Sequence, residues 1–331
     1  MSQAAVAQAA SASPAQIAEG VLARERRALA KAITLIESTR AEDRPRADEL
    51  LNALLPRAGA ALRLGISGVP GVGKSTFIEA LGLHLIRAGH RVAVLAIDPS
   101  SSLSGGSILG DKTRMEMLAA EEQAFIRPSP SAGTLGGVAE KTREAMLVCE
   151  AAGHDVVLVE TVGVGQSETT VAGMTDFFVL LQLPNAGDDL QAMKKGIMEL
   201  ADLVVVNKCD LDAAAAARAA NQISQALRIF GEHDSRRVLQ VSALTGQGLG
   251  ELWQEVESHA ASRRASGEFE QRRRQQAEAW LWDIVRSRLL QDFRAHAAVR
   301  AALPQFQADI GAGRVAPSAA ARALLALFER N

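Results

Sequence analysis

The sequence predicts an α/β protein built on a doubly wound, mostly parallel sheet, and two observations predict it. Apolar runs recur along the chain, and most of them are apolar at consecutive positions, which is typical of strands buried on both faces. Helical patterns separate these runs, as right-handed crossover connections require. The expected strands are Leu62 to Ser67, Arg91 to Asp98, Ala124 to Arg127, Val156 to Glu160, Phe177 to Leu183, Leu203 to Asn207 and Arg237 to Val241.

Helical extensions are expected on both sides of this sheet. Residues 15 to 55 carry an apolar stripe at helical spacing that we expect to pack against the sheet domain. Residues 262 to 331 carry a second stripe, for which two interpretations stay open: packing within the chain, or a helical arm that forms a dimer. The first stripe is Ile17, Leu22, Leu29, Ile33, Ile36, Leu50, Leu51 and Leu54, and the second is Trp280, Leu281, Ile284, Val285 and Leu289.

The composition indicates a globular protein and excludes several classes of function. The chain has 331 residues, 48% of them apolar, and a net charge of −2. Because it has no basic surplus, only 4% aromatic residues and no tyrosine, nucleic-acid binding is not expected. Two distant cysteines, Cys149 and Cys209, indicate no disulfide framework. No apolar run approaches the ~20 residues that span a bilayer, and no secretion or transit signal is recognisable, so we expect a cytoplasmic protein without membrane contact.

Residues 68 to 75, Gly-Val-Pro-Gly-Val-Gly-Lys-Ser, match the phosphate-binding loop G-x-x-x-x-G-K-[ST] at every fixed position. The loop follows an expected strand and precedes a helical pattern. Glycine lets the backbone N–H groups approach a polyphosphate, and the N-terminus of the following helix favours its negative charge. We expect Lys74 to reach the β- and γ-phosphates and Ser75 to bind Mg²⁺. The nucleotide-binding residues assigned here are Gly68, Gly71, Val72, Gly73, Lys74, Ser75 and Thr76.

A second motif, Asn207-Lys208-Cys209-Asp210, follows an expected strand and fits a guanine-reading loop. The Asp210 carboxylate can accept hydrogen bonds from both N1–H and the 2-amino group of guanine, a donor pair that adenine lacks. Asn207 is expected to tie this loop to the phosphate loop, and the Lys208 stem to lie along the base. Ser242, Ala243 and Leu244 follow the last expected strand and resemble a second guanine-contacting loop. Together these loops predict a GTP site on a P-loop NTPase fold.

These motifs predict three parts of the chain. Residues 1–60 form an N-terminal helical extension, residues 61–260 the P-loop GTPase domain, and residues 261–331 a C-terminal helical dimerisation arm.

Two aspartates and a glycine-rich loop lie between the nucleotide motifs. Asp98 ends an expected strand and Asp111 follows a glycine-rich bend, so both carboxylates can reach Mg²⁺ beside Ser75. The run Glu160-Thr161-Val162-Gly163 then resembles a switch, in which the Gly163 N–H contacts the γ-phosphate until hydrolysis releases it.

The residues also resemble one family in particular. The runs at 68 to 76, 98 to 101 (Asp-Pro-Ser-Ser), 105 to 115, 125 to 130 and 160 to 168 (Glu-Thr-Val-Gly-Val-Gly-Gln-Ser-Glu) closely resemble the MeaB/ArgK family. Its members are G-protein chaperones of adenosylcobalamin-dependent acyl-CoA mutases. The resemblance runs from about residue 20 to the C-terminus.

The resemblance implies particular roles. It implies that Lys74 and Ser75 bind phosphate and Mg²⁺, and that Asp98 and Asp111 lie near the metal. Glu160 would belong to the second switch and also bind the metal. Asn207, Lys208 and Asp210 would contact guanine. Residues 187 to 195 match a segment that in the family responds to the partner enzyme, and Asp188, Gln191 and Lys194 are its candidate residues. The catalytic set is therefore Lys74, Asp98, Glu160, Asp188 and Lys194.

The resemblance also implies a mechanism and partners. Ras-like GTPases carry Asp-x-x-Gly-Gln, whereas this chain has Glu160, and Val164 takes the place of the glutamine, so the residue that positions water is not identified. We expect a GTPase that is slow alone and stimulated by its partner mutase. Its expected role is to gate cofactor loading and to protect or reactivate an acyl-CoA mutase such as methylmalonyl-CoA mutase. A homodimer is expected, with an adenosyltransferase as a further partner.

Two other classes share the phosphate loop. A nickel metallochaperone GTPase usually displays clustered Cys and His, whereas this chain has six scattered histidines and two cysteines. A small-molecule kinase has no need for a guanine-reading loop. Both remain alternatives to the mutase chaperone.

Overall fold

The computed structural model describes residues 12–97, 115–127, 135–161, 166–184, 195–230 and 237–329. The chain divides into two compact units, residues 1–273 and 274–331. Among the described residues, no helix is both long and apolar enough to cross a membrane.

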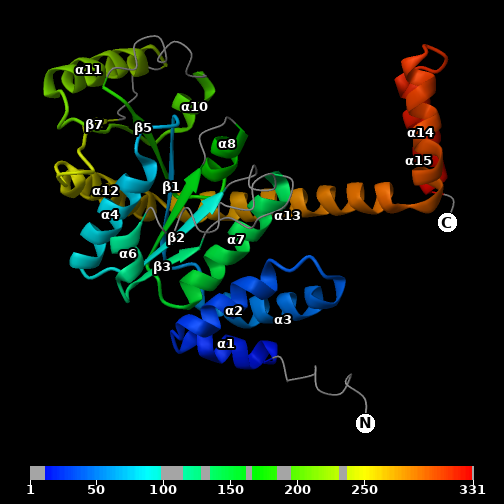
Figure 1. The fold of residues 1–331 in the computed structure, drawn as a ribbon, viewed down its shortest axis with the longest axis horizontal. Coiled ribbons are helices and arrows are strands. Elements are labelled where there is room, and N and C mark those ends of the chain that lie inside the picture. Colours follow the sequence, from blue (N-terminus) through cyan, green and yellow to red (C-terminus); the bar gives the residue numbers. More distant parts are fainter. Residues whose placement is uncertain are drawn as a thin grey trace. The chain divides into compact units, whose positions relative to one another are not determined.

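The first unit is built on a seven-stranded sheet in which every neighbouring pair is parallel, in the order β3-β2-β4-β1-β5-β6-β7 (Figure 1). This confirms the predicted fold class, and each strand lies at or within two residues of its expected range. The strands are β1 (Leu62–Gly68), β2 (Val92–Ile97), β3 (Ala124–Arg127), β4 (Val156–Thr161), β5 (Phe177–Gln182), β6 (Leu203–Val206) and β7 (Val238–Gln240).

Helices connect the strands and extend the chain at both ends. The first unit contains α1 (Pro14–Leu22), α2 (Arg26–Ile36), α3 (Arg44–Leu54), α4 (Lys74–Arg87), α6 (Glu116–Ala120), α7 (Leu135–Ala151), α8 (Gln166–Ala172), α10 (Lys195–Leu200), α11 (Ala213–Phe230) and α12 (Leu249–Ser266), with short 3₁₀ turns η2 (Ala41–Asp43) and η3 (Leu55–Arg57). Helix α13 (Glu268–Ala295) begins in the first unit and continues into the second, which also holds α14 (Ala297–Gly311) and α15 (Pro317–Phe328).

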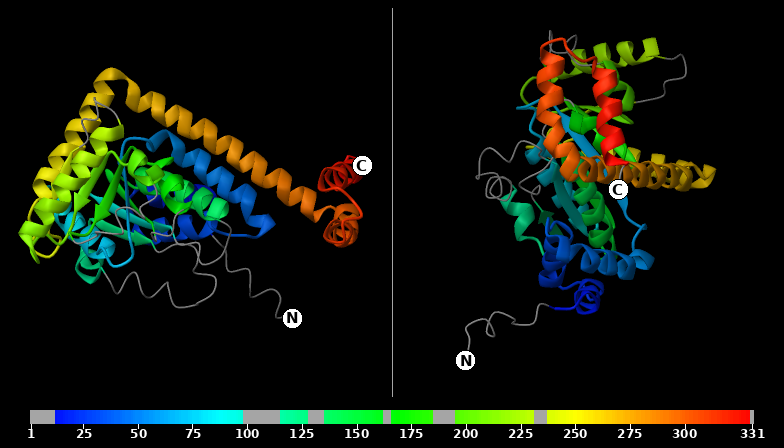
Figure 2. Two further views of the ribbon diagram at one scale, coloured as in Figure 1. Left: turned by 90° about the horizontal axis from the view of Figure 1, so that it is seen from above. Right: turned by 90° about the vertical axis from the view of Figure 1, so that its right-hand side faces the viewer.

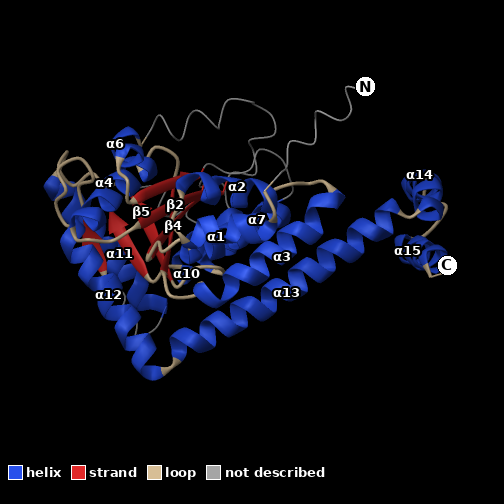
Figure 3. Cartoon of the chain, turned by 90° about the horizontal axis from the view of Figure 1, so that it is seen from below, coloured by secondary structure: helices blue, strands red, loops and turns tan. Residues whose placement is uncertain are grey.

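The sheet is buried on both faces, which explains why its strands are apolar at consecutive positions. On strands such as β4, β5 and β6, alternate residues enter two separate hydrophobic clusters. On β4, Val157 and Val159 pack on one side with α7, α8, α10, α11 and the N-terminal helices, whereas Val156 and Leu158 pack on the other side with α4, α6 and α12. Helices lie on both sides of the sheet (Figure 3).

The strand order positions the ligand loops. Strand β1 lies at the centre between β4 and β5, and Ile66 is paired with Glu160. The loop after β1 therefore lies beside the end of β4, and the loop after β6 lies two strands away at the same edge. The carboxyl ends of parallel strands are where ligands bind in open α/β sheets.

Gly65 allows α8 to approach this central strand closely. A Cβ atom at position 65 would lie 2.7 Å from Val171 Cγ1 and 2.8 Å from Thr175 Oγ1. Real Cβ atoms do not approach other atoms this closely, so only glycine permits the observed packing of α8 on β1.

The N-terminal helices pack on the sheet domain as the sequence predicts. Ile33, Ile36, Leu50 and Leu54 are fully buried in the cluster that also contains α7. Leu22 is an exception, because it ends α1 with 42% of its surface exposed. Its position fits the helical period, but the chain turns there into α2, so its inclusion in the stripe was wrong.

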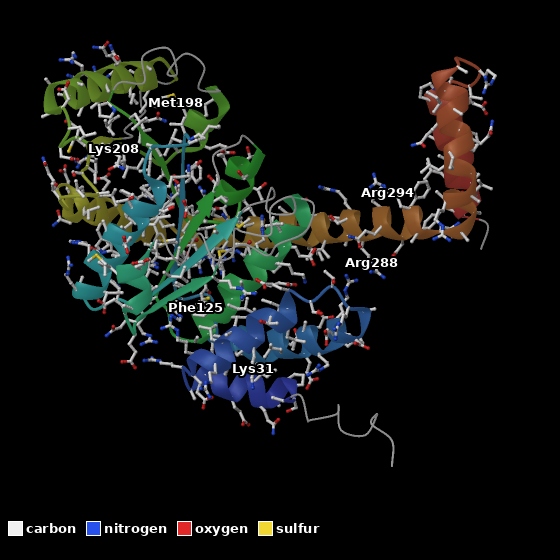
Figure 4. The ribbon with its side chains drawn as sticks, in the orientation of Figure 1. Lys31, Phe125, Met198, Lys208, Arg288 and Arg294 are labelled. Carbon is white, nitrogen blue, oxygen red and sulfur yellow. The ribbon has the colours of Figure 1, made fainter. Side chains whose placement is uncertain are left out.

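The second unit is helical. Helices α14 and α15 lie side by side (Figure 2), and the Phe328 ring meets the rings of Phe293 and His296 edge-on, each at 5.5 Å between centroids. Arg288 and Arg294 extend from α13 (Figure 4). Four large apolar side chains of α13 are exposed by 49 to 58%: Leu281, Trp282, Leu289 and Leu290.

Candidate nucleotide site

The phosphate-loop motif forms the turn between β1 and α4. Gly71 and Gly73 have φ angles of +82° and +92°, in the left-handed region that residues with a Cβ rarely adopt. Between them Val72 is buried and anchors the loop to the core. The turn ends at Gly73, the N-cap of α4, so the N-terminus of that helix points toward the loop.

The predicted phosphate-binding lysine lies within this loop. Lys74 Nζ donates to the carbonyl oxygens of Gly68 at 2.8 Å and Val69 at 3.3 Å. Burial lowers the pKa of Lys74, while the negative charges of Glu160 and Glu168 oppose that shift. The loop thus presents a partly desolvated cation, which is the form that interacts most strongly with a phosphate group.

Two oxygen donors meet beside this lysine. The Ser75 hydroxyl donates to Glu160 Oε1 at 3.2 Å. The pairing of β1 with β4 brings the two residues together, because Glu160 lies next to Ile66 in the sheet. A hydroxyl and a carboxylate are hard oxygen ligands of the kind that Mg²⁺ prefers.

The predicted guanine loop contacts the phosphate loop directly. Asn207 is buried, and its Nδ2 donates to the Val72 carbonyl at 2.9 Å, while Lys208 Nζ donates to the Gly71 carbonyl at 2.9 Å. Lys208 adopts a φ of +62°, an uncommon conformation for a residue with a side chain, and in the view of Figure 4 it lies between α11 and α12. Side-chain hydrogen bonds within the protein therefore hold the two nucleotide motifs together.

Asn207 also contacts the third predicted loop. Its Oδ1 accepts a hydrogen bond from the backbone N–H of Ala243 at 3.2 Å. Ser242 is buried, whereas Leu244 is 79% exposed and Asp210 is also exposed. Asp210 and Leu244 thus lie at the solvent-exposed side of the site, where a base could reach them.

The structure brings together the described members of the predicted site, which come from the ends of β1, β4, β6 and β7. The predicted Asp98, Asp111, Gly163, Asp188, Gln191 and Lys194 lie outside the described residues. Glu168, to which the sequence assigned no role, is 2% exposed on α8 and acts electrostatically on Lys74. Glu168 ends the sequence run 160 to 168, and only its burial in the fold indicates a role for it.

The family model described as methylmalonyl Co-A mutase-associated GTPase MeaB matches residues 29–298. The chain belongs to the MeaB family. It has the P-loop GTPase fold of that family, and it is a GTPase that hydrolyses GTP to GDP and phosphate.

Individual relatives agree with this membership of the MeaB family. The chain is 54% identical to a putative GTPase of Caulobacter vibrioides, over 93% of this chain and 95% of the relative. It is 44% identical to the mitochondrial methylmalonic aciduria type A homolog of Mus musculus, over 94% and 78% of the two chains. A crystal structure of an LAO/AO transport system kinase superposes with a TM-score of 0.76, at 38% identity and 99% coverage of both chains.

Proposed function

We propose that this GTPase is a chaperone of an adenosylcobalamin-dependent acyl-CoA mutase such as methylmalonyl-CoA mutase. It gates loading of the cofactor, and it protects or reactivates the mutase. The observation that carries this proposal is the match of residues 29–298 to a family described as associated with that mutase. The name of the mouse relative, methylmalonic aciduria type A homolog, supports it further.

The proposed chemistry is divided among the loops of the site. Backbone N–H groups of residues 68 to 76 and the Lys74 ammonium bind the phosphates, and Asn207 and Lys208 position Asp210 to accept from guanine. Ser242, Ala243 and Leu244 provide the contact to the base oxygen. The bond of Asn207 to Val72, 2.9 Å long, supports these roles because it fixes the distance between the base and phosphate subsites.

Ser75 and Glu160, with Asp98 and Asp111, are the residues that would hold Mg²⁺. Their fit rests on the 3.2 Å contact between the Ser75 hydroxyl and the Glu160 carboxylate. When bound, Mg²⁺ neutralises charge on the β- and γ-phosphates. Glu160 orients the Ser75 hydroxyl, while Gly163 contacts the γ-phosphate.

Hydrolysis is proposed to be slow in the isolated protein and faster with the mutase, through Asp188, Gln191 and Lys194. The test is the rate of phosphate release with and without the mutase, for wild type and for Asp188→Ala and Lys194→Ala. Glu257→Ala, at an exposed position of α12, is the control. Stimulation that both variants lose and the control keeps supports the proposal, and equal rates with and without the mutase refute it.

Cofactor loading is proposed to depend on the nucleotide. An adenosyltransferase delivers adenosylcobalamin to the mutase, and the GTPase admits the intact cofactor only in one nucleotide state. The test is transfer of adenosylcobalamin and of its inactivated form with GDP or with a GTP analogue. Transfer that does not depend on the nucleotide contradicts the proposal.

The active form is proposed to be a cytoplasmic homodimer, with an N-terminal extension at 1–60, the GTPase domain at 61–260 and a dimerisation arm at 261–331. Exposed Leu281, Trp282 and Leu289 on α13 support the arm, since surface apolar side chains in one stripe are typical of contact sites. The test is light scattering of wild type and Leu281→Glu. A monomeric wild type refutes the dimer.

A small-molecule kinase remains a second candidate, because a related crystal structure carries the name of a transport system kinase. A kinase transfers phosphate to an acceptor, whereas a GTPase releases it. Free phosphate equal to the GTP consumed, in a mixture without any acceptor, favours the chaperone.

A further inference from the structure

A cavity of about 390 Å³ opens in the first unit at the edge of the sheet opposite the phosphate loop. Its lining includes Ala61, directly before β1, and Asp155, directly before β4, whereas the nucleotide loops follow the other ends of these strands. The turn between α1 and α2 and the end of η3 complete it. Its volume lies at the lower end of the range for small-ligand pockets, about 300 to 1,000 Å³.

The two carboxylates in this lining already have partners. Glu150 accepts hydrogen bonds from Arg63 Nε at 2.6 Å and from the backbone N–H of Gly59. Asp155 accepts from the backbone N–H of Arg91 at 2.7 Å, and its other oxygen lies 2.8 Å from His90 Nδ1. Their oxygens thus accept hydrogen bonds from neighbouring groups, although the negative charge of Asp155 still acts on His154 in the same lining.

Two arginines line the same cavity without such partners. Within the described part of the chain, neither the Arg24 nor the Arg57 guanidinium has a hydrogen bond or an ion pair. The Arg24 guanidinium lies against Gly153, where a Cβ atom would come within 2.9 Å of Arg24 Nε. Arg24 itself has a φ of +64°, an uncommon backbone conformation for arginine. The turn and the glycine together place this guanidinium at the wall of the cavity.

A buried histidine supplies a hydrogen-bond acceptor. His154 lines the cavity with 5% of its surface exposed, and its Nδ1 lies 3.0 Å from the Cys149 carbonyl, so Nδ1 carries the proton. Burial lowers the pKa of His154 to about 4; the positive charges of Arg91 and Arg24 add to this shift, and the hydrogen bond to Cys149 and the charge of Asp155 oppose it. The ring is therefore neutral near pH 7, and Nε2, which has no partner among the described residues, is an acceptor.

We propose that this cavity binds a small phosphorylated ligand, with Arg24 and Arg57 on the phosphoryl oxygens and His154 Nε2 accepting the proton of a P–OH group. Two guanidinium groups match the oxygens of a phosphoryl group. A carboxylate near pH 6.5 has no proton to donate, whereas a phosphoryl group with a second pKa of about 6 keeps a proton on a fraction of its molecules. The acceptor therefore favours phosphate over a carboxylate or a sulfate.

The test uses the full-length protein saturated with Mg²⁺ and a non-hydrolysable GTP analogue, so that the phosphate loop is filled. Inorganic phosphate is titrated at pH 6.5 and followed by NMR of ¹⁵N-labelled histidine, with His154 assigned through His154→Gln. The expected result is a saturable shift of the His154 Nε2 signal. Sulfate, which has a similar shape but no proton at this pH, is expected to bind more weakly by about tenfold, the worth of one hydrogen bond to a charged group.

Variants test the arginines. Arg57→Gln and Arg24→Asn, which keeps a residue that tolerates positive φ, are each expected to weaken phosphate binding about tenfold or more. Arg44→Gln, at an exposed arginine of α3 outside the cavity, is the control. Thermal unfolding checks that each variant is folded. No shift of His154, equal binding of phosphate and sulfate, or equal phosphate binding by the arginine variants and the control would each overturn the proposal.

Discussion

Asn207 joins the phosphate loop to the guanine loop through one hydrogen bond, in which its Nδ2 donates to the Val72 carbonyl oxygen at 2.9 Å across 135 residues of sequence. Because the same side chain accepts from the Ala243 N–H, three loops converge on a single buried amide.

Asn207→Ala is expected to lower both stability and nucleotide affinity. It leaves the Val72 carbonyl and the Ala243 N–H without their partner, at about 1–3 kcal/mol for each buried group left unpaired. Urea unfolding and calorimetric titration with GDP measure the two effects. Asn221→Ala, on the exposed face of α11, should change neither. Unchanged GDP affinity in Asn207→Ala would contradict the proposed tie between the loops.

Asp210→Asn is expected to lower affinity for GDP by about a hundredfold or more, because an amide cannot accept from both guanine donors and leaves one donor of the bound base without its partner. Calorimetric titration with GDP measures the loss. The matched control is Asp212→Asn, since Asp212 Oδ1 only caps α11 by accepting from the Ala215 N–H at 2.8 Å. A variant at position 210 that binds GDP like wild type would remove Asp210 from the guanine site.

Asp176→Ala is expected to destabilise the first unit by about 3–5 kcal/mol, as for other buried ion pairs that lose one partner. Asp176 is 3% exposed and accepts from Arg273 Nε at 2.8 Å, Arg273 Nη2 at 2.6 Å and the Arg63 N–H at 2.8 Å. Asp283→Ala removes an exposed pair with Arg286 and should cost less than about 1 kcal/mol. Chemical denaturation measures the free energy of unfolding of both variants. Equal losses of stability would show that burial of the ion pair does not determine the loss.

Stability is expected to fall as the pH drops from about 6.5 toward 4. Burial lowers the pKa of His154 from 6.5 to about 4, so in this window the unfolded chain binds a proton that the folded protein does not. Protonation therefore stabilises the unfolded state relative to the folded state, by up to about 3 kcal/mol at pH 4. Urea unfolding at several pH values measures the slope. His154→Gln, which cannot titrate, should have a shallower slope, and an unchanged slope would contradict the assignment.

The sequence predicted most of the fold because the strands other than the edge strand β7 are largely buried. Strand β3, from Ala124 to Arg127, coincides with its expected range, and Val156 begins β4 as expected. The strand order was not predicted, since it depends on which apolar faces pair in space and not on any local pattern.

The site was predictable where a loop follows a strand with a fixed motif, as at Lys74 and Asn207. It was not predictable where packing decides the role of a residue. In the sequence Glu168 looks like an ordinary polar residue at the start of a helix. In the structure it is buried on α8, and its charge acts on Lys74. The contact of Arg273 with Asp176 joins residues 97 apart, and no spacing in the sequence indicates it.

Because Gly65 has no side chain, α8 packs directly against the backbone of β1. Helix α8 carries Glu168, so a methyl group at position 65 would push a carboxylate away from the phosphate loop while touching no nucleotide. A substitution of Gly65 in the hydrophobic interior would then lower the rate of GTP turnover. For a protein of this family, a harmful variant can therefore lie in the core and still act on hydrolysis.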